Sequence, residues 1–78
     1  MNIRLNGARH VLADGATVGA LVSGVTGRTL AADGQATDGR KLGVAVARNA
    51  GVVPRSQWHA TALAEGDDVE LVTAVQGG

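Results

Sequence analysis

Apolar and polar residues alternate along the first five positions of the chain, and this pattern constrains the fold more than any other. Such alternation is the period of a half-buried β-strand, with every second side chain on one face: Met1, Ile3 and Leu5. Asn6-Gly7 follows, and both residue types tolerate the positive φ that a type I′ hairpin turn requires. We therefore expect a β-hairpin with a returning strand over residues 9–13, closed by Asp14-Gly15.

After residue 17 the period changes to that of a helix. Apolar residues recur at spacings of three and four positions, which places them in one stripe: Val18, Leu21, Val22 and Val25. Thr17 is a residue type that caps helix N-termini. Gly19 and Gly24 each weaken a helix by about 1 kcal/mol relative to Ala, so we expect packing against a sheet to hold this helix together.

The second half of the chain is typical of strands and turns that follow one long polar loop. Residues 27–41 are rich in Gly and Asp, and a loop of this length indicates either mobility or a binding role, of which mobility is the favoured interpretation. The expected order after it is a buried strand at 42–47, a turn at 49–51, a short strand at 52–53 stopped by Pro54, an irregular or single-turn segment at 54–58, a turn at 65–68 and a final strand at 69–75.

Strand pairs that flank one helix, in a chain whose last element is a strand, predict an α+β sheet covered on one face by that helix. The first and last strands should lie side by side and parallel at the centre of the sheet. The other strands and the long loop should lie at its margins, and no internal repeat or second domain is visible.

Composition excludes several classes of function. The chain has 78 residues with 7 Lys and Arg against 7 Asp and Glu, so it lacks the basic surface of a nucleic-acid or membrane binder. It has no cysteine, which removes thiol nucleophiles and thiolate metal ligands, and its shallow core argues against an autonomous enzyme. Without a signal-peptide core or a membrane-spanning apolar run, we expect a soluble, cytoplasmic protein that binds no metal or cofactor.

The sequence ends in Gly77-Gly78, two residues without side chains. Glycine makes up 12 of the 78 residues, and at that composition a terminal pair arises by chance in about 2% of chains. The pair alone is therefore a weak signal, and its meaning depends on the domain that precedes it.

Several motifs occur in one order before this tail, and together they resemble the ThiS family, the sulfur carriers of thiamin thiazole biosynthesis. In the first half the matching positions are Ile3, Asn6-Gly7 and Thr17-Val18. In the second half they are residues 43–49, residues 53–58 (Val-Pro-Arg-Ser-Gln-Trp), Leu63, Gly66-Asp67, residues 69–72 and residues 74–78. The resemblance covers the chain except residues 27–41, where this sequence carries a longer and more polar insertion.

The resemblance implies a β-grasp, ubiquitin-like fold, with a mixed sheet of about four to five strands and one main helix packed on one face. It implies a division into a β-grasp domain, residues 1–75, and a flexible C-terminal diglycine tail, residues 76–78.

The resemblance also implies a carrier without catalysis of its own. In that family an E1-like activating enzyme uses ATP to adenylate the terminal glycine carboxylate, a sulfur-donating enzyme supplies the sulfur of a thiocarboxylate, and a thiazole synthase receives that sulfur. Carried over here, Gly78 holds the reactive carbonyl and Gly77 is its slender neighbour. ATP and the sulfur donor are used by the partner enzymes, so no cofactor is expected on this chain.

The residue types agree with this chemistry. An ionised carboxylate reacts poorly with nucleophiles until its oxygen becomes a good leaving group, which AMP provides. The sequence has no P-loop pattern, so a separate enzyme must bind the ATP. Glycine gives the low bulk and the free backbone dihedrals that a tail needs to enter an enclosed active site.

Three further positions are assigned to partner recognition. Val75 and Gln76 lie between the last strand residues and the diglycine, so we expect partner enzymes to pair with their backbone, as in strand addition. Arg55 has two interpretations, an ion pair with a carboxylate of its own domain or a contact to an acidic patch of a partner. The first of these is favoured.

The remaining polar residues have structural interpretations. His10 and His59 lack obvious companions for a metal site. Asp67-Asp68 is expected to be a turn with solvated charges instead of an acid/base pair. Ser56 is expected to cap the short turn before Trp58, and Trp58 itself to lie in the core or over the sheet edge, with a partner surface as the lesser alternative.

Other functions stay open at this point. The same tail chemistry also suits the small subunit of molybdopterin synthase or a carrier for another sulfur-containing metabolite, although residues 53–56 and Trp58 favour the thiazole branch. A ubiquitin-like interaction or conjugation module is the alternative from a different class.

Overall fold

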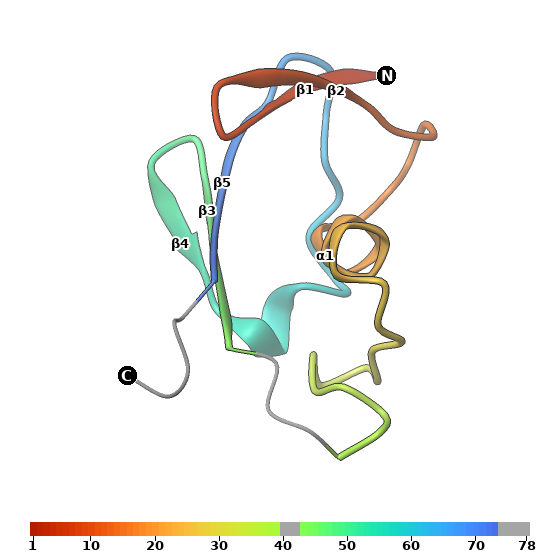
Figure 1. Cartoon of the computed structure of the whole chain (residues 1–78). Helices are drawn as coiled ribbons and strands as arrows, with labels where there is room; N and C mark the ends of the chain where they lie inside the picture. The colour runs from red at the N-terminus through yellow and green to blue at the C-terminus, as the bar shows by residue number, and fades with distance from the viewer. Residues whose placement is uncertain (40–42, 74–78) are drawn as a thin grey trace.

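In the computed structural model, which describes residues 1–39 and 43–73, one helix lies over one face of a five-stranded sheet (Figure 1). Along the chain the elements are β1 (Asn2–Leu5), β2 (Ala8–Val11), α1 (Val18–Thr26), β3 (Val44–Arg48), β4 (Gly51–Val53), the single-turn 3-10 helix η1 (Arg55–Gln57) and β5 (Asp68–Thr73). The sheet order is β2-β1-β5-β3-β4. β5 pairs in parallel with β1 and antiparallel with β3, so the predicted central pairing of the first and last strands is confirmed.

The first hairpin forms at the predicted turn. Asn6 and Gly7 have φ values of 52° and 81°, both in the left-handed region that a type I′ turn requires. Asn6 also joins the hairpin to β5, because its side chain accepts a hydrogen bond from the Leu71 N–H at 2.8 Å and donates one to the Leu71 carbonyl at 3.1 Å. The returning strand, β2, spans residues 8–11 and so begins and ends earlier than the predicted 9–13.

Helix α1 begins at the predicted cap. Thr17 Oγ1 accepts a hydrogen bond from the Ala20 N–H at 3.1 Å, and the helix ends at Gly27, whose φ is 71°. Gly19 is buried, and a Cβ there would lie 3.1 Å from Nδ1 of His59. This glycine therefore allows the helix to approach the segment after η1 closely.

The predicted apolar stripe of α1 is buried over its first three positions, Val18, Leu21 and Val22. The fourth, Val25, is 46% exposed, so its expected place on the buried face is wrong. Val25 lies in the last turn of the helix, one residue before its end at Thr26, and is not a member of the buried cluster.

The core lies between α1 and the sheet, and Trp58 is its largest fully buried side chain. Figure 1 shows the single turn η1 between the sheet and α1, and Trp58 directly follows η1 in the sequence. The Trp58 side chain is 1% exposed, and its Nε1 donates to the Val53 carbonyl at 3.0 Å, so the predicted core position is confirmed. The other buried members of the cluster are Ile3, Val18, Leu21, Val22, Val44, Val46, Leu63, Val69 and Leu71.

Candidate functional site

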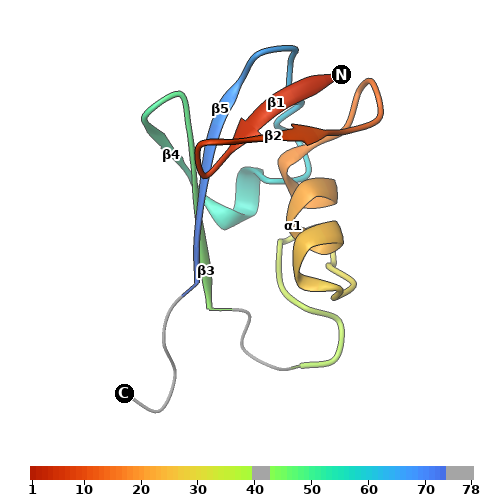
Figure 2. The same ribbon diagram turned by 45° about the horizontal axis from the view of Figure 1, so that its top comes forward.

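The predicted carrier residues follow the central strand of the sheet. Val75, Gln76, Gly77 and Gly78 lie outside the described part of the chain, as does the predicted domain boundary after residue 75. The strand that precedes them, β5, pairs with β1 at Asp68 and Val69 and with β3 from Val69 to its last residue, Thr73, which lies opposite Val44 at the start of β3. Figure 2 shows β3 and β5 side by side down to this point. The predicted tail is therefore anchored at the middle of the sheet and not on an edge strand.

Arg55 is the predicted site residue that the structure describes, and its guanidinium reaches the same end of β3. Nη2 donates to the Val44 carbonyl at 3.4 Å and Nη1 to Oε1 of Gln35 at 3.3 Å, both long hydrogen bonds. Its Cζ lies 5.5 Å from the centroid of the Trp58 ring, within the range of a cation–π contact. Its Nε is buried without a hydrogen-bond partner.

The favoured interpretation of Arg55, an ion pair with a carboxylate of its own domain, is wrong for the described residues. There the ion pairs are those of the N-terminal ammonium with Asp14, Arg28 with Asp38, and Arg48 with Asp67. Arg55 instead contacts an amide, a backbone carbonyl and an aromatic ring. Its contact with a partner stays a prediction.

The polar insertion holds Arg55 in this position. Leu30 pairs with Ala36 in an isolated β-bridge, and the Ala31 N–H donates to the Gln35 carbonyl at 2.8 Å, so residues 30–36 form a closed turn. Gly34 lies directly against Arg55, since a Cβ on Gly34 would be 2.2 Å from Arg55 Cγ. The described part of the insertion thus has defined contacts with the domain, while its mobility stays a prediction.

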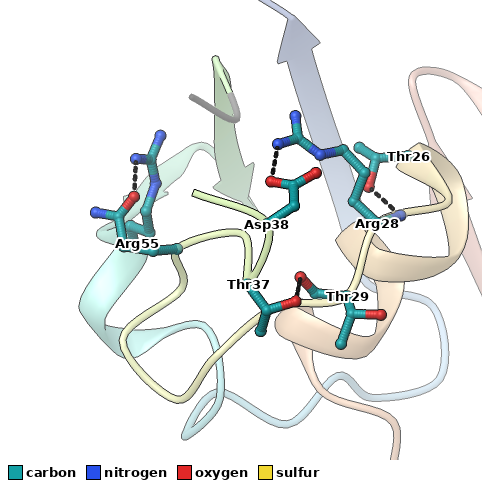
Figure 3. Close-up of polar contacts among 7 residues, drawn as sticks. Thr26, Arg28, Thr29, Thr37, Asp38 and Arg55 are labelled. Carbon is teal, nitrogen blue, oxygen red and sulfur yellow. Dashed lines mark hydrogen bonds and ion pairs between the residues drawn. The ribbon is translucent and has the colours of Figure 1, made fainter. Parts of the chain in front are cut away.

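A second set of contacts joins the two arms of the insertion near the end of α1 (Figure 3). Nη2 of Arg28 lies 2.9 Å from Oδ1 of Asp38, and the two side chains face each other in Figure 3. The Thr37 N–H donates to the Thr29 carbonyl at 2.9 Å, and the Thr37 hydroxyl donates to the same oxygen at 3.3 Å. These contacts fix the base of the loop whose turn supports Arg55.

Asp67 is part of a buried network, so the expectation that its charge is solvated is wrong. Its side chain accepts hydrogen bonds from Arg48 Nε at 2.8 Å, Asn49 Nδ2 at 3.1 Å and the Ala64 N–H at 2.8 Å. Burial raises the pKa of the Asp67 carboxyl, but these hydrogen bonds and the charge of Arg48 outweigh it and hold the pKa below its ordinary value of 3.8. Asp68 is exposed as expected, so the two carboxylates do not form an acid/base pair.

The other predicted polar residues contribute no chemistry that the structure shows. Ser56 is the middle residue of η1 and does not cap it, because the turn begins one residue earlier with Pro54 as its N-terminal flank. His10 lies on β2 opposite Ile3, and His59 follows η1 beside Gly19. Within residues 1–39 and 43–73, no three His, Asp or Glu side chains gather as metal ligands, and no helix is long and apolar enough to cross a membrane.

Comparison with known proteins agrees with the motifs. The sequence matches the model of the ThiS family over residues 3–78. The crystal structure of the thiamine biosynthesis protein ThiS from Geobacter metallireducens is 26% identical, with a TM-score of 0.71 and 100% of both chains covered. An NMR structure of a thiamine biosynthesis protein from the same organism is 28% identical, with a TM-score of 0.70, and the match covers 100% of this chain and 88% of the other. No curated protein matches the sequence.

A third structure shows a likeness of fold alone. SAMP1 from Haloferax volcanii is 22% identical, with a TM-score of 0.55 over 99% of this chain and 97% of the other. The shared mixed sheet with one helix confirms the predicted α+β, β-grasp architecture. Because the family match includes the first strand, the Val53–Trp58 motif and the diglycine, this chain belongs to the ThiS family.

Proposed function

We propose that this chain is a sulfur carrier protein of thiamine biosynthesis, and that the carboxylate of Gly78 is the group that carries the sulfur. Membership of the ThiS family and the likeness to the crystal and NMR structures of a thiamine biosynthesis protein from Geobacter metallireducens support this assignment. The structural observation that carries it is the position of β5, which lies between β1 and β3 in the sheet, pairs with β3 up to Thr73 and precedes the diglycine in the sequence.

The proposed tail is long enough to act away from the domain surface. Five residues separate Thr73 from the end of the sequence, and an extended chain of that length spans about 17 Å. Glycine at both terminal positions keeps the last part of this reach slender, so that an enclosed active site can admit it. In this proposal the partner enzymes recognise the folded domain, and the reaction takes place at the end of the thin tail.

The proposed reaction has two steps on the partner enzyme. An oxygen of the Gly78 carboxylate attacks the α-phosphorus of ATP, pyrophosphate leaves, and an acyl adenylate forms. Sulfur from the donor enzyme, at the oxidation level of hydrosulfide, then attacks the Gly78 carbonyl carbon, a C–S bond forms, and AMP leaves, which gives the thiocarboxylate directly. If the donor presents a persulfide, its terminal sulfur displaces AMP to form an acyl disulfide, and a thiol reductant then cleaves the S–S bond to release the thiocarboxylate. A thiazole synthase takes this sulfur and returns the carboxylate, so the chain acts as a co-substrate that is consumed and regenerated.

The mass of the protein tests this proposal. The chain is incubated with the adenylating enzyme of its source organism, ATP and a sulfur donor. Replacement of one oxygen by sulfur adds about 16 mass units, and omission of ATP should abolish the gain. Gly77→Val, which adds a β-branched side chain beside the reacting carbonyl, should fold normally and react far more slowly.

Two outcomes would count against the carrier assignment. An unchanged mass in the complete reaction would refute it. Normal thiocarboxylation of Gly77→Val would refute a narrower claim, that the tail must be slender at residue 77. An adduct of this chain with a lysine of another protein, formed without sulfur, would favour conjugation instead.

A further inference from the structure

The β3–β4 hairpin exposes an unused backbone edge at Val52. β4 is an edge strand of the sheet, and its two-residue turn consists of Asn49 and Ala50, with φ values of 50° and 71°. The residues that flank such a turn form a hydrogen-bonded pair, here Arg48 with Gly51, so the next pair, Ala47 with Val52, does not exchange hydrogen bonds. The N–H and C=O of Val52 therefore point away from β3, and its side chain is 79% exposed.

Arg55 lies at the end of this same edge, and its guanidinium has N–H donors that the described contacts do not use. A guanidinium has five N–H donors, of which the one on the Arg55 Nε is buried; the described contacts use two of the four on Nη1 and Nη2, in long hydrogen bonds to Gln35 and Val44. The stack on Trp58 and the close contact with Gly34 hold the side chain in place, so little conformational freedom remains to be lost on binding.

An open groove of about 510 Å³ joins the two features. Val52 and Pro54 contribute apolar surface to it, Arg55 contributes the cation, and Asp33 also lines it. The Asp33 carboxylate disfavours a doubly charged free phosphate in this groove. A single carboxylate in a mainly apolar, extended peptide carries half that charge, so Asp33 repels it less, and its two oxygens match the planar fork of the guanidinium.

The docking edge, defined as Val52 and Arg55, is close to the start of the proposed tail. Arg55 contacts the Val44 carbonyl, and Val44 pairs with Thr73 at the end of β5. Adjacent strands are about 4.8 Å apart, and β4 and β3 separate an added strand from β5, so a partner seated on this edge lies about 14 Å from the point where the proposed tail begins.

We propose that the docking edge binds an extended, acidic segment of the adenylating enzyme, which adds as a strand at Val52 and places a carboxylate on Arg55. This inference rests on the proposed carrier function, because it identifies how the enzyme that activates Gly78 recognises the domain. The backbone pairing supplies affinity, and the charge contact fixes the register of the added strand.

Binding of the full-length protein to the purified adenylating enzyme of the source organism tests the inference. Arg55→Glu should raise Kd about ten-fold or more, because it places a like charge opposite the partner carboxylate, and Arg55→Lys should raise it less. Val52→Pro removes the outward N–H and should also raise Kd several-fold. Val52→Glu keeps the backbone N–H and repels an acidic segment, so it should also raise Kd and tests the same position without a change to the backbone.

Matched controls exist at the other edge of the sheet. Arg9 is exposed on β2, and Val11 is 66% exposed and lies in a pair with Asn2 that, by the same alternation, is not hydrogen-bonded. Arg9→Glu and Val11→Pro should therefore change Kd less than two-fold, on the order of the scatter for surface substitutions. Urea unfolding of each variant shows that the fold is kept.

The outcomes separate this inference from the carrier function. If the wild-type chain gains sulfur but Arg55→Glu and Val52→Glu bind like wild type, the docking edge is refuted and the carrier function stands. Equal weakening by Arg9→Glu and Arg55→Glu would also refute it, since only net charge would then matter. If the wild-type chain neither binds this enzyme nor gains sulfur, both proposals fail.

Discussion

Arg48 and Arg55 flank the β3–β4 hairpin at its two ends, and their surroundings are opposite in kind. Arg48 ends β3 beside the turn, where its Nε lies 2.8 Å from the buried carboxylate of Asp67. Arg55 follows β4 at the open end, where it contacts an amide and a carbonyl at 3.3 Å and 3.4 Å. Within the described residues, one cation is neutralised and the other is held in place without a counter-charge.

The difference separates a structural arginine from one that is open to a partner. A cation whose charge is already matched by a buried carboxylate contributes to the fold. A cation that is positioned by weak contacts near the end of β5 retains most of its capacity to bind an anion. Three substitutions and one change of pH test this difference between the two arginines.

The largest loss of stability is expected from a substitution at the Arg48 end of the hairpin. Asp67→Ala leaves Arg48, the Asn49 amide and the Ala64 N–H without their acceptor, and we expect it to lower the free energy of unfolding by about 2–3 kcal/mol, since hydrogen bonds to a charged group are the stronger kind. Urea unfolding at neutral pH measures this loss. Asp68→Ala is the matched control, because the Asp68 side chain is exposed and its removal should cost less than about 0.5 kcal/mol. Equal losses would show that the network does not stabilise the hairpin.

Gly34→Ala tests whether the insertion holds Arg55. A Cβ at this position would lie 2.2 Å from Cγ and 2.5 Å from the carbonyl oxygen of Arg55, so the loop or the arginine must move, at a cost of about 1–3 kcal/mol. Gly39→Ala in the same loop has a similar φ, 77° against 82°, and no atom within 4 Å. The difference in unfolding free energy between the two variants isolates the collision from the backbone strain, and no difference would mean that Gly34 does not support Arg55.

Low pH should remove the stabilising contribution of the Arg48–Asp67 contact. Because the pKa of Asp67 is lowered by folding, its contribution to stability is complete above the ordinary value of 3.8 and is lost as the pH falls through the lower pKa of the folded state. We therefore expect the unfolding free energy of the wild type to fall more steeply below this pH than that of Asp67→Asn. Urea unfolding over an acid pH series measures how the free energy of unfolding of each protein changes with pH. Parallel slopes would show that Asp67 is not the group responsible for the loss of stability in acid.

The smallest effect is expected at the base of the insertion. The Asp38 side chain is 52% exposed, and an ion pair in such a position contributes at most about 1 kcal/mol. Asp38→Asn should therefore shift the urea midpoint only slightly and leave the Trp58 environment, seen by fluorescence, unchanged. A loss as large as that of Asp67→Ala would mean that burial does not distinguish the Arg48–Asp67 ion pair from the exposed Arg28–Asp38 ion pair.

The sequence was sufficient for the elements whose signals are local. Alternation predicted β1, Asn6-Gly7 predicted its turn, and Thr17 predicted the start of α1, because each depends on a few neighbouring residues. The central parallel pairing of β1 with β5 also followed from the order of the elements.

Contacts between residues far apart in the sequence had no such signal. The Asp67 network joins positions 48, 49 and 64, and a turn motif such as Gly66-Asp67 indicates a solvated carboxylate unless the partners are known. The support of Arg55 by Gln35 depends on how residues 30–36 close on themselves, which a Gly- and Asp-rich composition does not specify. The double hydrogen bond between Asn6 and Leu71 was missed for the same reason.

The claim that Gly78 carries sulfur is tested most directly on the peptide of residues 56–78. Trypsin releases it after Arg55, and no Lys or Arg follows in the sequence. The peptide excludes Met1, whose oxidation also adds about 16 mass units and confuses the intact mass. After reaction with the adenylating enzyme, ATP and a sulfur donor, we predict a gain of about 16 mass units that fragment ions place on Gly78. An unchanged peptide, or a gain confined to Trp58, would contradict the sulfur-carrier function.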